Sequence, residues 1–395
     1  MILKITQEEF LERQKNFITK YTKKSIDAAI IFSPIDIFYL TGFHFSATER
    51  PICLIVDADQ ETHMFVPLLE EDHALDNAFV DHVVTYPEYP GERHPMEHLK
   101  DILKDLKLAN KVIGLDARGY GSPMGYEGPA VEEVFAAKDY VLIPKLVEKM
   151  RMVKSDAEVA LIEESCRWAN LAHQLLQKYT YAGANEIDVV NKVRRDAGWA
   201  MIHTLGDRYI PHGQSAFAYY RGQIGKNSAY PHINKPNSIF KRGDTLVTAA
   251  GADVFGYGSE LERIMFVDEV SPEQEKYFNI ATEALELAID TIKPGIPVSV
   301  IDETIRDFFK QENVLKYSLH HVGHALGISH HEAPFFDVGD STIIEPNMIF
   351  TVEPGLYIKG FGGFRHSDTI VVTETGARKL TYYPTDLESL ICHTR

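Results

Sequence analysis

The sequence predicts an α+β protein with an N-terminal α/β domain over residues 1–150 and a C-terminal domain over residues 151–395. In the first part, short apolar segments alternate with helical ones, which is typical of an α/β layer. In the second part, long helical segments are separated by β-rich, glycine-rich stretches, which favours α+β. A length of 395 residues is also enough for about two to three domains.

The N-terminal part begins with an amphipathic helix over residues 7–24, because Phe10, Phe17, Ile18 and Tyr21 recur at helical spacing. The segment that follows, residues 26–32, is apolar and ends at a Ser-Pro pair, as a buried strand would. Similar short runs predict further strands over residues 51–56, 63–68, 83–87, 112–116 and 140–144, with a helix over residues 95–106.

The C-terminal part begins with a long helix to about Tyr179, for which Ser155 and Asp156 are a suitable cap. Later patterns predict helices over residues 185–200, 271–292 and 298–312, a hairpin over residues 245–267, and strands over residues 347–356 and 363–373. The junction between the two domains is therefore expected near residue 150.

The composition narrows the possible partners and the location. A net charge of −17 disfavours nucleic acids and anionic membranes, which bind basic surfaces. Cys53, Cys166 and Cys392 are far apart, which fits a reducing compartment better than a disulfide scaffold. No signal-peptide-like or membrane-spanning apolar run is visible in the sequence. We therefore expect a cytoplasmic globular protein.

Several polar side chains stand in short motifs rich in glycine or proline. Histidine can move protons near neutral pH, and paired glutamates can orient water, hold a cation or ligate a hard metal. Such groups converging on one pocket could drive the cleavage of a C–N bond by water. The candidates are His232 in AYPHINKP, Glu260 and Glu262 in GSELER, His324 and His331 in GHALGISHHEAP, Glu353 in TVEPG, and Arg365 in FRHSD.

Together these motifs resemble the pita-bread family of methionine aminopeptidases, prolidases, aminopeptidase P and creatinase. The resemblance covers nearly the whole chain, because AAIIFSPIDIFYLTGF is similar to the opening of the creatinase/prolidase N-terminal domain. MVKSDAEVALIEESCRWA is similar to the first helix of the family's catalytic domain. The resemblance implies a creatinase/prolidase-type N-terminal domain, a pita-bread catalytic domain and a homodimer.

The chain departs from this family at the metal ligands. Metallopeptidases of the family hold two ions through an Asp, a second Asp eleven residues on, a His and two Glu. The matching positions here are Ala249, Glu260, His324, Glu353 and Ser367. Alanine offers no ligand and serine no charge, so a tight dinuclear centre is not expected. Creatinase is the family's metal-free precedent, and GSELERIMFV resembles its corresponding segment.

We therefore expect a hydrolase that cleaves a C–N bond in a small guanidino, amide or dipeptide-like substrate, without a metal cofactor. In this hypothesis His232 shuttles a proton between water and the leaving nitrogen. Glu262 and Glu353 hold the cationic part of the substrate. His324, His331 and Arg365 complete the substrate-binding set.

Two alternatives stay open. The first is a metal-dependent Xaa-Pro dipeptidase, or an enzyme similar to aminopeptidase P, with one Mn, Co or Zn ion. Glu260, His324 and Glu353 would hold this ion, with His366 or Asp368 as nearby helpers. The second is a non-catalytic pita-bread module that binds peptides or proteins.

Overall fold

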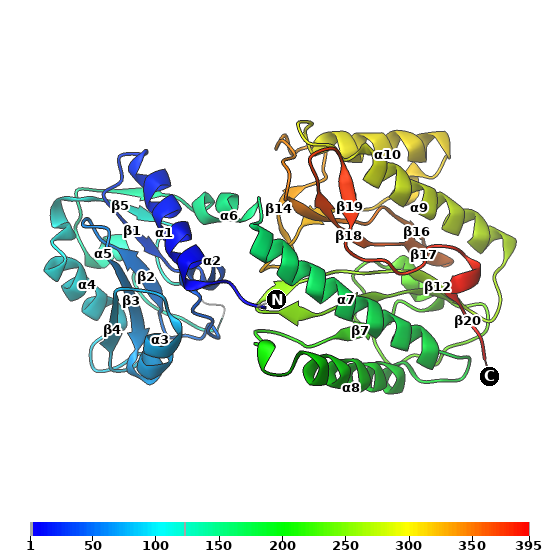
Figure 1. The fold of residues 1–395 in the computed structure, drawn as a ribbon, viewed down its shortest axis with the longest axis horizontal. Helices are drawn as coiled ribbons and strands as arrows, with labels where there is room; N and C mark the ends of the chain where they lie inside the picture. Colours follow the sequence, from blue (N-terminus) through cyan, green and yellow to red (C-terminus); the bar gives the residue numbers. More distant parts are fainter. Residues whose placement is uncertain (1–2, 122–123, 395) are drawn as a thin grey trace. The chain divides into compact units, whose positions relative to one another are not determined.

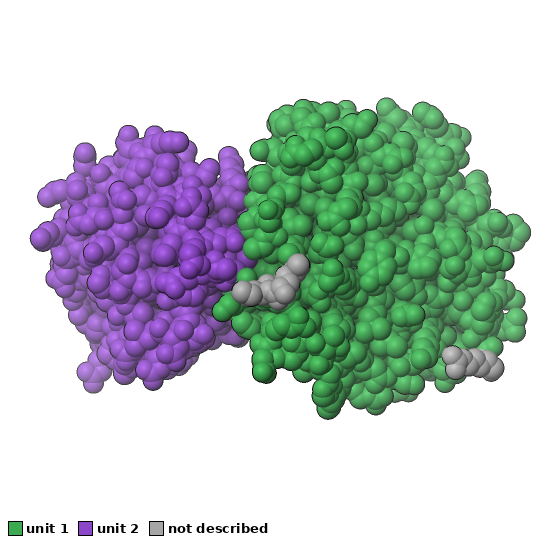
Figure 2. Space-filling model, viewed as in Figure 1, with its two compact units in different colours: residues 1–4, 152–395 green, residues 5–151 purple. Residues whose placement is uncertain are grey.

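The computed structural model describes residues 3–121 and 124–394. These residues form two compact units, shown in different colours in Figure 2. One unit is Ile5–Arg151, and the other consists mainly of the chain from Met152 onward. Whether each unit folds as an independent domain stays a prediction.

The first unit is built on a six-stranded sheet with the strand order β4-β3-β2-β1-β5-β6. Pairing is antiparallel between β1 and β2 and between β2 and β3, and parallel at the other three interfaces. The strands, all predicted from the sequence, are β1 (Ala28–Ile31), β2 (Cys53–Val56), β3 (Thr62–Pro67), β4 (His82–Tyr86), β5 (Val112–Leu115) and β6 (Asp139–Leu142). This order leaves β4 and β6 at the edges.

Helices accompany this sheet (Figure 1). They are α1 (Gln7–Thr22), α2 (Pro34–Thr41), α3 (Glu71–Asn77), α4 (Pro95–Asp105), α5 (Val131–Val134) and α6 (Leu146–Arg151). The sequence pattern predicts α1 and α4 but misses α2. In the structure Ser33 accepts a hydrogen bond from the backbone N–H of Asp36, and Pro34 occupies the first turn. The Ser-Pro pair therefore starts a helix as well as ending a strand.

The second unit contains two pairs of adjacent helices (Figure 1). The first pair, α7 (Asp156–Tyr179) and α8 (Glu186–Leu205), packs against β7 (Phe217–Tyr219) and β9 (Ala249–Gly251). The second pair is α9 (Pro272–Thr291) and α10 (Ser299–Gln311). Ser155 and Glu158 form a capping box at the start of α7, which confirms the predicted helix start. None of the helices within residues 3–121 and 124–394 is long and apolar enough to cross a membrane.

The strands of the second unit form several small sheets. The largest has the order β14-β13-β15-β18-β19, and a second has the order β20-β12-β8. The strands are β7 (Phe217–Tyr219), β8 (Thr245–Val247), β9 (Ala249–Gly251), β10 (Asp253–Val254), β11 (Tyr257–Gly258), β12 (Ile264–Val267), β13 (His324–Ala325), β14 (Glu332–Phe335), β15 (Ile349–Val352), β16 (Gly355–Ile358), β17 (Gly362–Arg365), β18 (Asp368–Val372), β19 (Ala377–Lys379) and β20 (Ile391–Cys392). The predicted hairpin is the antiparallel β8–β12 pair.

Candidate active site

The candidate side chains come from strand ends that the sheets bring together. His324 begins β13, and Glu353 follows β15, which pairs with both β13 and β18. A separate bridge joins Glu262 to Ser367, because each backbone N–H donates to the other's carbonyl oxygen at 3.0 Å. This bridge places the Glu260–Glu262 segment beside the start of β18.

Glu260, His324 and Glu353 form a compact cluster in which one ligand atom from each lies within 4.8 Å of the others. His324 donates from Nδ1 to the carbonyl oxygen of Ala325 at 3.0 Å, which leaves a lone pair on Nε2. That Nε2 lies 3.2 Å from Glu353 Oε1, yet it has no hydrogen-bond partner of acceptable geometry in the described residues. A lone pair facing a carboxylate is unfavourable unless a cation lies between them.

The charges in this cluster shift the pKa values of its members. Burial lowers the pKa of His324, but Glu353 and Glu260 outweigh burial and raise it to about 9. Burial raises the pKa of Glu353, and His324 together with Arg365 reverses the shift, to about 2. The cluster therefore favours a cation near His324 Nε2, which can be either a proton or a metal ion.

His331 stacks on His324, with ring centroids 3.8 Å apart and an interplanar angle of 21°. Burial and the neighbouring His324 lower the pKa of His331 to about 4. His331 is therefore neutral at neutral pH, and its exposed side chain can accept a proton or a hydrogen bond from a substrate.

Glu262 is bound to Arg365 in a buried bidentate ion pair. Arg365 Nη2 donates to Glu262 Oε1 at 2.7 Å, and its Nε donates to Oε2. Arg365 Nη1 also donates to the hydroxyl of Tyr357 at 2.9 Å, and Arg221 Nη2 lies 3.8 Å from Glu262 Oε1. The cationic partner of Glu262 in this structure is thus Arg365, and the hypothesis that Glu262 holds a substrate cation stays a prediction.

Arg221 and Tyr357 are polar groups of this site that the sequence analysis did not select. No motif marks Arg221, which follows Tyr219 and Tyr220 and has a side chain that is 31% exposed. Tyr357 follows TVEPG closely and so could have been considered. Its hydroxyl also contacts His320 Nε2 at 2.9 Å, which gives this histidine a packing and hydrogen-bonding role.

Ala249 and Ser367 stand at the two positions where the chain lacks the family's carboxylate. Ala249 is buried in β9 opposite Tyr219 of β7 and presents only a methyl group. Ser367 is fully buried and donates from its hydroxyl to Glu260 Oε1 at 2.8 Å. Ser367 therefore orients Glu260 and adds no negative charge.

His232 does not belong to the Glu260–His324–Glu353 cluster. It is exposed in the loop after the short 3₁₀ helix Gly225–Ala229, and none of the described interactions joins it to Glu260, His324 or Glu353. Its proposed role in proton transfer stays a prediction.

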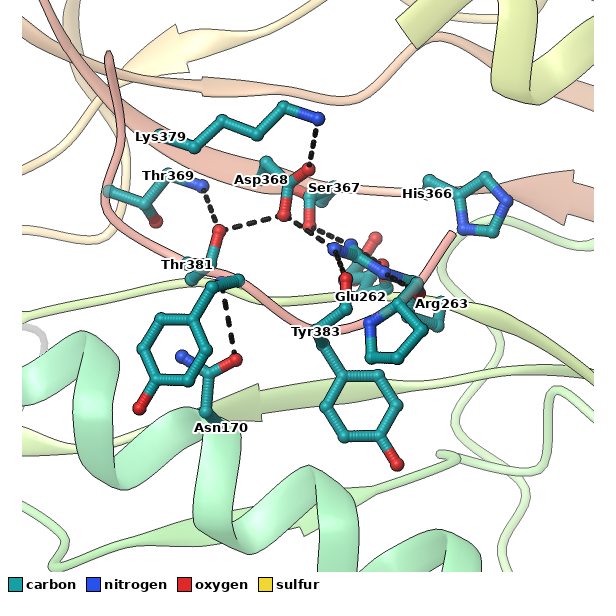
Figure 3. A network of polar contacts seen from close by, with 12 residues as sticks. Asn170, Glu262, Arg263, His366, Ser367, Asp368, Thr369, Lys379, Thr381 and Tyr383 are labelled. Carbon is teal, nitrogen blue, oxygen red and sulfur yellow. Dashed lines mark hydrogen bonds and ion pairs between the residues drawn. The ribbon is translucent and has the colours of Figure 1, made fainter. Parts of the chain in front are cut away.

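A second buried network, centred on Arg263, supports the strands that carry the site (Figure 3). The five N–H groups of the Arg263 guanidinium donate to the carbonyl oxygens of Glu262, Ser367, Tyr383 and Pro384 and to Asp368 Oδ1, at 2.7–2.9 Å. All donor positions of the guanidinium are thereby used. Arg263 links β12 and β18 to the C-terminal segment.

His366 and Asp368, considered above as helpers of a metal site, belong to this supporting network. Asp368 is paired with Arg263, and its Oδ1 also accepts from Thr381. His366 packs edge-on against Phe278, and Figure 3 shows its ring turned away from the Arg263–Asp368 pair. Neither residue belongs to the Glu260–His324–Glu353 cluster, so their role as helpers of a metal site stays a prediction.

His366 and His173 are buried histidines from which we expect a pH dependence of the stability of the second unit. Both are fully buried, and burial lowers the pKa of each well below 6.5, with Arg263 adding to the shift. Lys379 and His173 also lower the pKa of His366. Among the described residues, the His173 ring is hydrogen-bonded to the Thr248 hydroxyl.

We predict a loss of stability as the pH falls below about 6.5, where the unfolded chain gains protons that the folded chain does not. Each histidine contributes about 1.4 kcal/mol per pH unit until its folded pKa is reached. Urea unfolding followed by tryptophan fluorescence measures this, because both tryptophans, Trp168 and Trp199, lie in the second unit. His366→Asn should flatten the dependence, and His203→Asn, at an exposed position, should not. An unchanged slope in His366→Asn would contradict the assignment.

The comparisons with known proteins agree on one family. The model of metallopeptidase family M24 matches residues 160–374, and that of the creatinase/prolidase N-terminal domain matches residues 13–153. A putative dipeptidase of Bacillus subtilis is 25% identical over 360 residues, covering 91% of this chain and 94% of its own. The Xaa-Pro dipeptidase of Pyrococcus furiosus is 26% identical over 374 residues, covering 94% and 97%.

Solved structures give the same result. The Xaa-Pro dipeptidase from Bacillus anthracis superposes with a TM-score of 0.80 at 25% identity, covering 97% of this chain and 99% of its own. The prolidase from Pyrococcus horikoshii gives a TM-score of 0.78 at 25% identity, covering 95% and 99%. These matches confirm the predicted combination of a creatinase/prolidase N-terminal domain and a pita-bread catalytic domain.

Proposed function

Because the chain belongs to metallopeptidase family M24, we propose that it is a peptidase that cleaves Xaa-Pro dipeptides with one divalent metal ion. Glu260, His324 and Glu353 would hold this ion. Hydrolysis of a C–N bond was expected from the sequence, and the relatives support a peptide bond as the bond that is cleaved. The metal-dependent alternative is thus better supported than the metal-free hypothesis.

The observation that carries this proposal is the orientation of His324. Its Nδ1–H is fixed by the Ala325 carbonyl oxygen, so Nε2 presents its lone pair to the two carboxylates. Histidines that ligate metals commonly donate their other ring N–H to such a partner. One imidazole nitrogen and two carboxylate oxygens suit Zn²⁺, Mn²⁺ or Co²⁺.

The donor set fits one ion better than two. Ala249 supplies no ligand, and Ser367 supplies a neutral hydroxyl that is already bonded to Glu260. Near Glu262, Arg365 already provides the positive charge that a second ion would bring. Arg221 Nη2 also lies 3.8 Å from Glu262 Oε1. Two dications held by so few carboxylates would be poorly neutralised.

A divalent ion at this position supplies Lewis acidity, which polarises a carbonyl group and makes water a better nucleophile near neutral pH. The chain's own residues would do the rest. The neutral, exposed His331 can bind the substrate beside the cluster, and His232 can move a proton to the leaving nitrogen. Arg221, which is partly exposed, offers a positive charge to a substrate carboxylate.

The metal-free cleavage of a guanidino compound is less well supported by this geometry. That hypothesis needs the carboxylate of Glu262 to hold the substrate's cation. Both of its oxygens are engaged by Arg365, which is buried beside it. Glu262 is better described as a positioning residue that keeps Arg365 next to Glu353.

The proposal predicts hydrolysis of Ala-Pro by the full-length protein, stimulated by Mn²⁺ or Co²⁺ and lost on chelation. Release of free proline measures it, and creatine in place of Ala-Pro is the comparison substrate. Activity on creatine that survives chelation, with none on Ala-Pro, would reject the proposal and restore the metal-free hypothesis. Absence of any turnover on either substrate class would favour a binding module.

His232 provides a separate prediction. We expect His232→Ala to lower kcat for Ala-Pro by about 10²–10⁴-fold, the usual contribution of a general acid or base. Because His232 is exposed, the unfolding transition should not change. His212→Ala is the control in the preceding loop. Full activity of His232→Ala would remove this residue from the proposed mechanism.

The assembly and location of the protein are also proposals. Full-length relatives with the same two-part architecture support a dipeptide as the substrate class. The homodimer and the cytoplasmic location expected from the sequence can be tested by sedimentation and by fractionation.

A further inference from the structure

A second group of potential ligands lies in the N-terminal unit, at the edge of its six-stranded sheet. Strand β4 is an edge strand and pairs in parallel with β3, with His82 opposite His63. Glu61 precedes β3 and lies two residues before His63, so the two point to the same side of the sheet. None of these residues stands in a motif that marks a site in the sequence.

These three side chains meet. Glu61, His63 and His82 each offer a ligand atom within 4.8 Å of the others. His82 Nε2 lies 3.1 Å from Glu61 Oε2, and the two imidazole rings are stacked with centroids 4.7 Å apart. Glu61 and His82 are about half exposed and can adjust to a ligand, whereas His63 is buried.

A buried carboxylate fixes the orientation of His63. Asp57 Oδ2 lies 2.9 Å from His63 Nε2, and Asp57 Oδ1 accepts from the backbone N–H groups of Asp59 and Glu61. An ionised carboxylate only accepts hydrogen bonds, so Nε2 of His63 carries the proton and Nδ1 keeps its lone pair. This carboxylate–histidine arrangement is the usual outer-shell support of a metal-binding imidazole.

From this geometry we propose that Glu61, His63 and His82 form a zinc site, with Asp57 as the positioning residue. Two imidazole nitrogens and one carboxylate oxygen are ligands that Zn²⁺ accepts, whereas Ca²⁺ and Mg²⁺ prefer oxygen alone. Three protein ligands leave a fourth position for water. The ion would tie the edge strand β4 to β3 and to the turn that begins at Asp57.

The test uses full-length protein carrying His324→Gln, which disables the candidate active-site cluster in the other unit. Titration with Zn²⁺ against a chromogenic chelator should show one equivalent bound, and His324→Gln/His82→Gln should lose it. His324→Gln/His73→Gln is the matched control, because His73 forms a comparable exposed pair with Glu70 at 2.7 Å. Retention of the ion in the His82 variant, or no binding to His324→Gln, would overturn the proposal.

A second variant tests the orientation of the His63 ring without removing a ligand. Asp57→Asn keeps an acceptor for the two backbone N–H groups but turns an amide N–H toward His63 Nε2. Nδ1 would then carry the ring proton, and Zn²⁺ affinity should fall by about 10–100-fold without unfolding. Electron paramagnetic resonance of bound Cu²⁺ should show two imidazole nitrogens in His324→Gln and one in the His82 variant. Equal affinity in Asp57→Asn, or no nitrogen coupling, would contradict the assigned ligands.

Discussion

Replacing His324 with glutamine is expected to abolish both metal retention by the second unit and hydrolysis of Ala-Pro. Its Nε2 is the one nitrogen in the Glu260–His324–Glu353 cluster, and glutamine offers only a weaker amide ligand in its place. Loss of an outer-shell partner already costs about 10–100-fold in metal affinity or activity, so loss of this ligand should cost at least about 100-fold in kcat/KM. Metal content and proline release measure the two effects.

His330→Gln is the matched control, because His330 belongs to the same motif but is exposed. It should keep the metal and most of the activity. If His324→Gln kept its activity, the catalytic centre would lie elsewhere. If it lost activity but retained the ion, His324 would act on the substrate and not on the metal.

Replacing Arg263 with methionine is expected to destabilise the second unit by about 3–5 kcal/mol. The side chains have similar length, but methionine cannot donate any of the five hydrogen bonds that Arg263 makes. Asp368, which is fully buried, would be left as a largely uncompensated charge, and buried carbonyl groups would lose their donors. Urea unfolding monitored by Trp168 and Trp199 reports on this unit.

Arg378→Gln is the control for loss of an arginine, because Arg378 makes an exposed ion pair with Glu163 at 3.4 Å. Exposed pairs contribute about 0–1 kcal/mol, so little change is expected. In Arg263→Met/Asp368→Leu, part of the lost stability should return because the unpaired charge is gone. A loss below about 1 kcal/mol in Arg263→Met would mean that the network does not support the strands.

The strands of the first unit and the long helices could be predicted because their signals are local. Apolar runs mark β1 to β6, and Ser155 with Asp156 marks the start of α7. The short helix α2 was missed because its eight residues begin at the proline of Ser33-Pro34, a pair that also ends strands. The run over residues 347–356 was predicted as one strand but divides into β15 and β16 around Glu353. The division matters because Glu353 lies in the break between the two strands and belongs to the cluster.

The candidate site could be predicted only in part. Motifs marked Glu260, His324 and Glu353, and the structure brings these three together. The partner of Glu262 could not be chosen, because Arg365 is 103 residues away and either a substrate or an internal cation was consistent with the sequence. Tertiary pairing across the Glu262–Ser367 bridge decides it.

The zinc site proposed in the first unit depends on the same kind of information. Glu61 and His63 are neighbours in sequence, but His82 joins them only through the parallel register of β3 and β4. No spacing rule for metal ligands includes that distance in sequence. Only the pairing of β3 with β4 shows that His82 lies beside the other two ligands.

The most direct test of the central claim is the number of metal ions held by full-length His82→Gln protein, in which only the Glu260–His324–Glu353 cluster should bind. The protein is loaded with Mn²⁺ or Co²⁺, desalted and assayed for metal content and Ala-Pro hydrolysis in the same sample. We predict one equivalent, with activity rising in proportion to the metal retained. Two equivalents, or full activity with no retained metal, would contradict a one-metal peptidase.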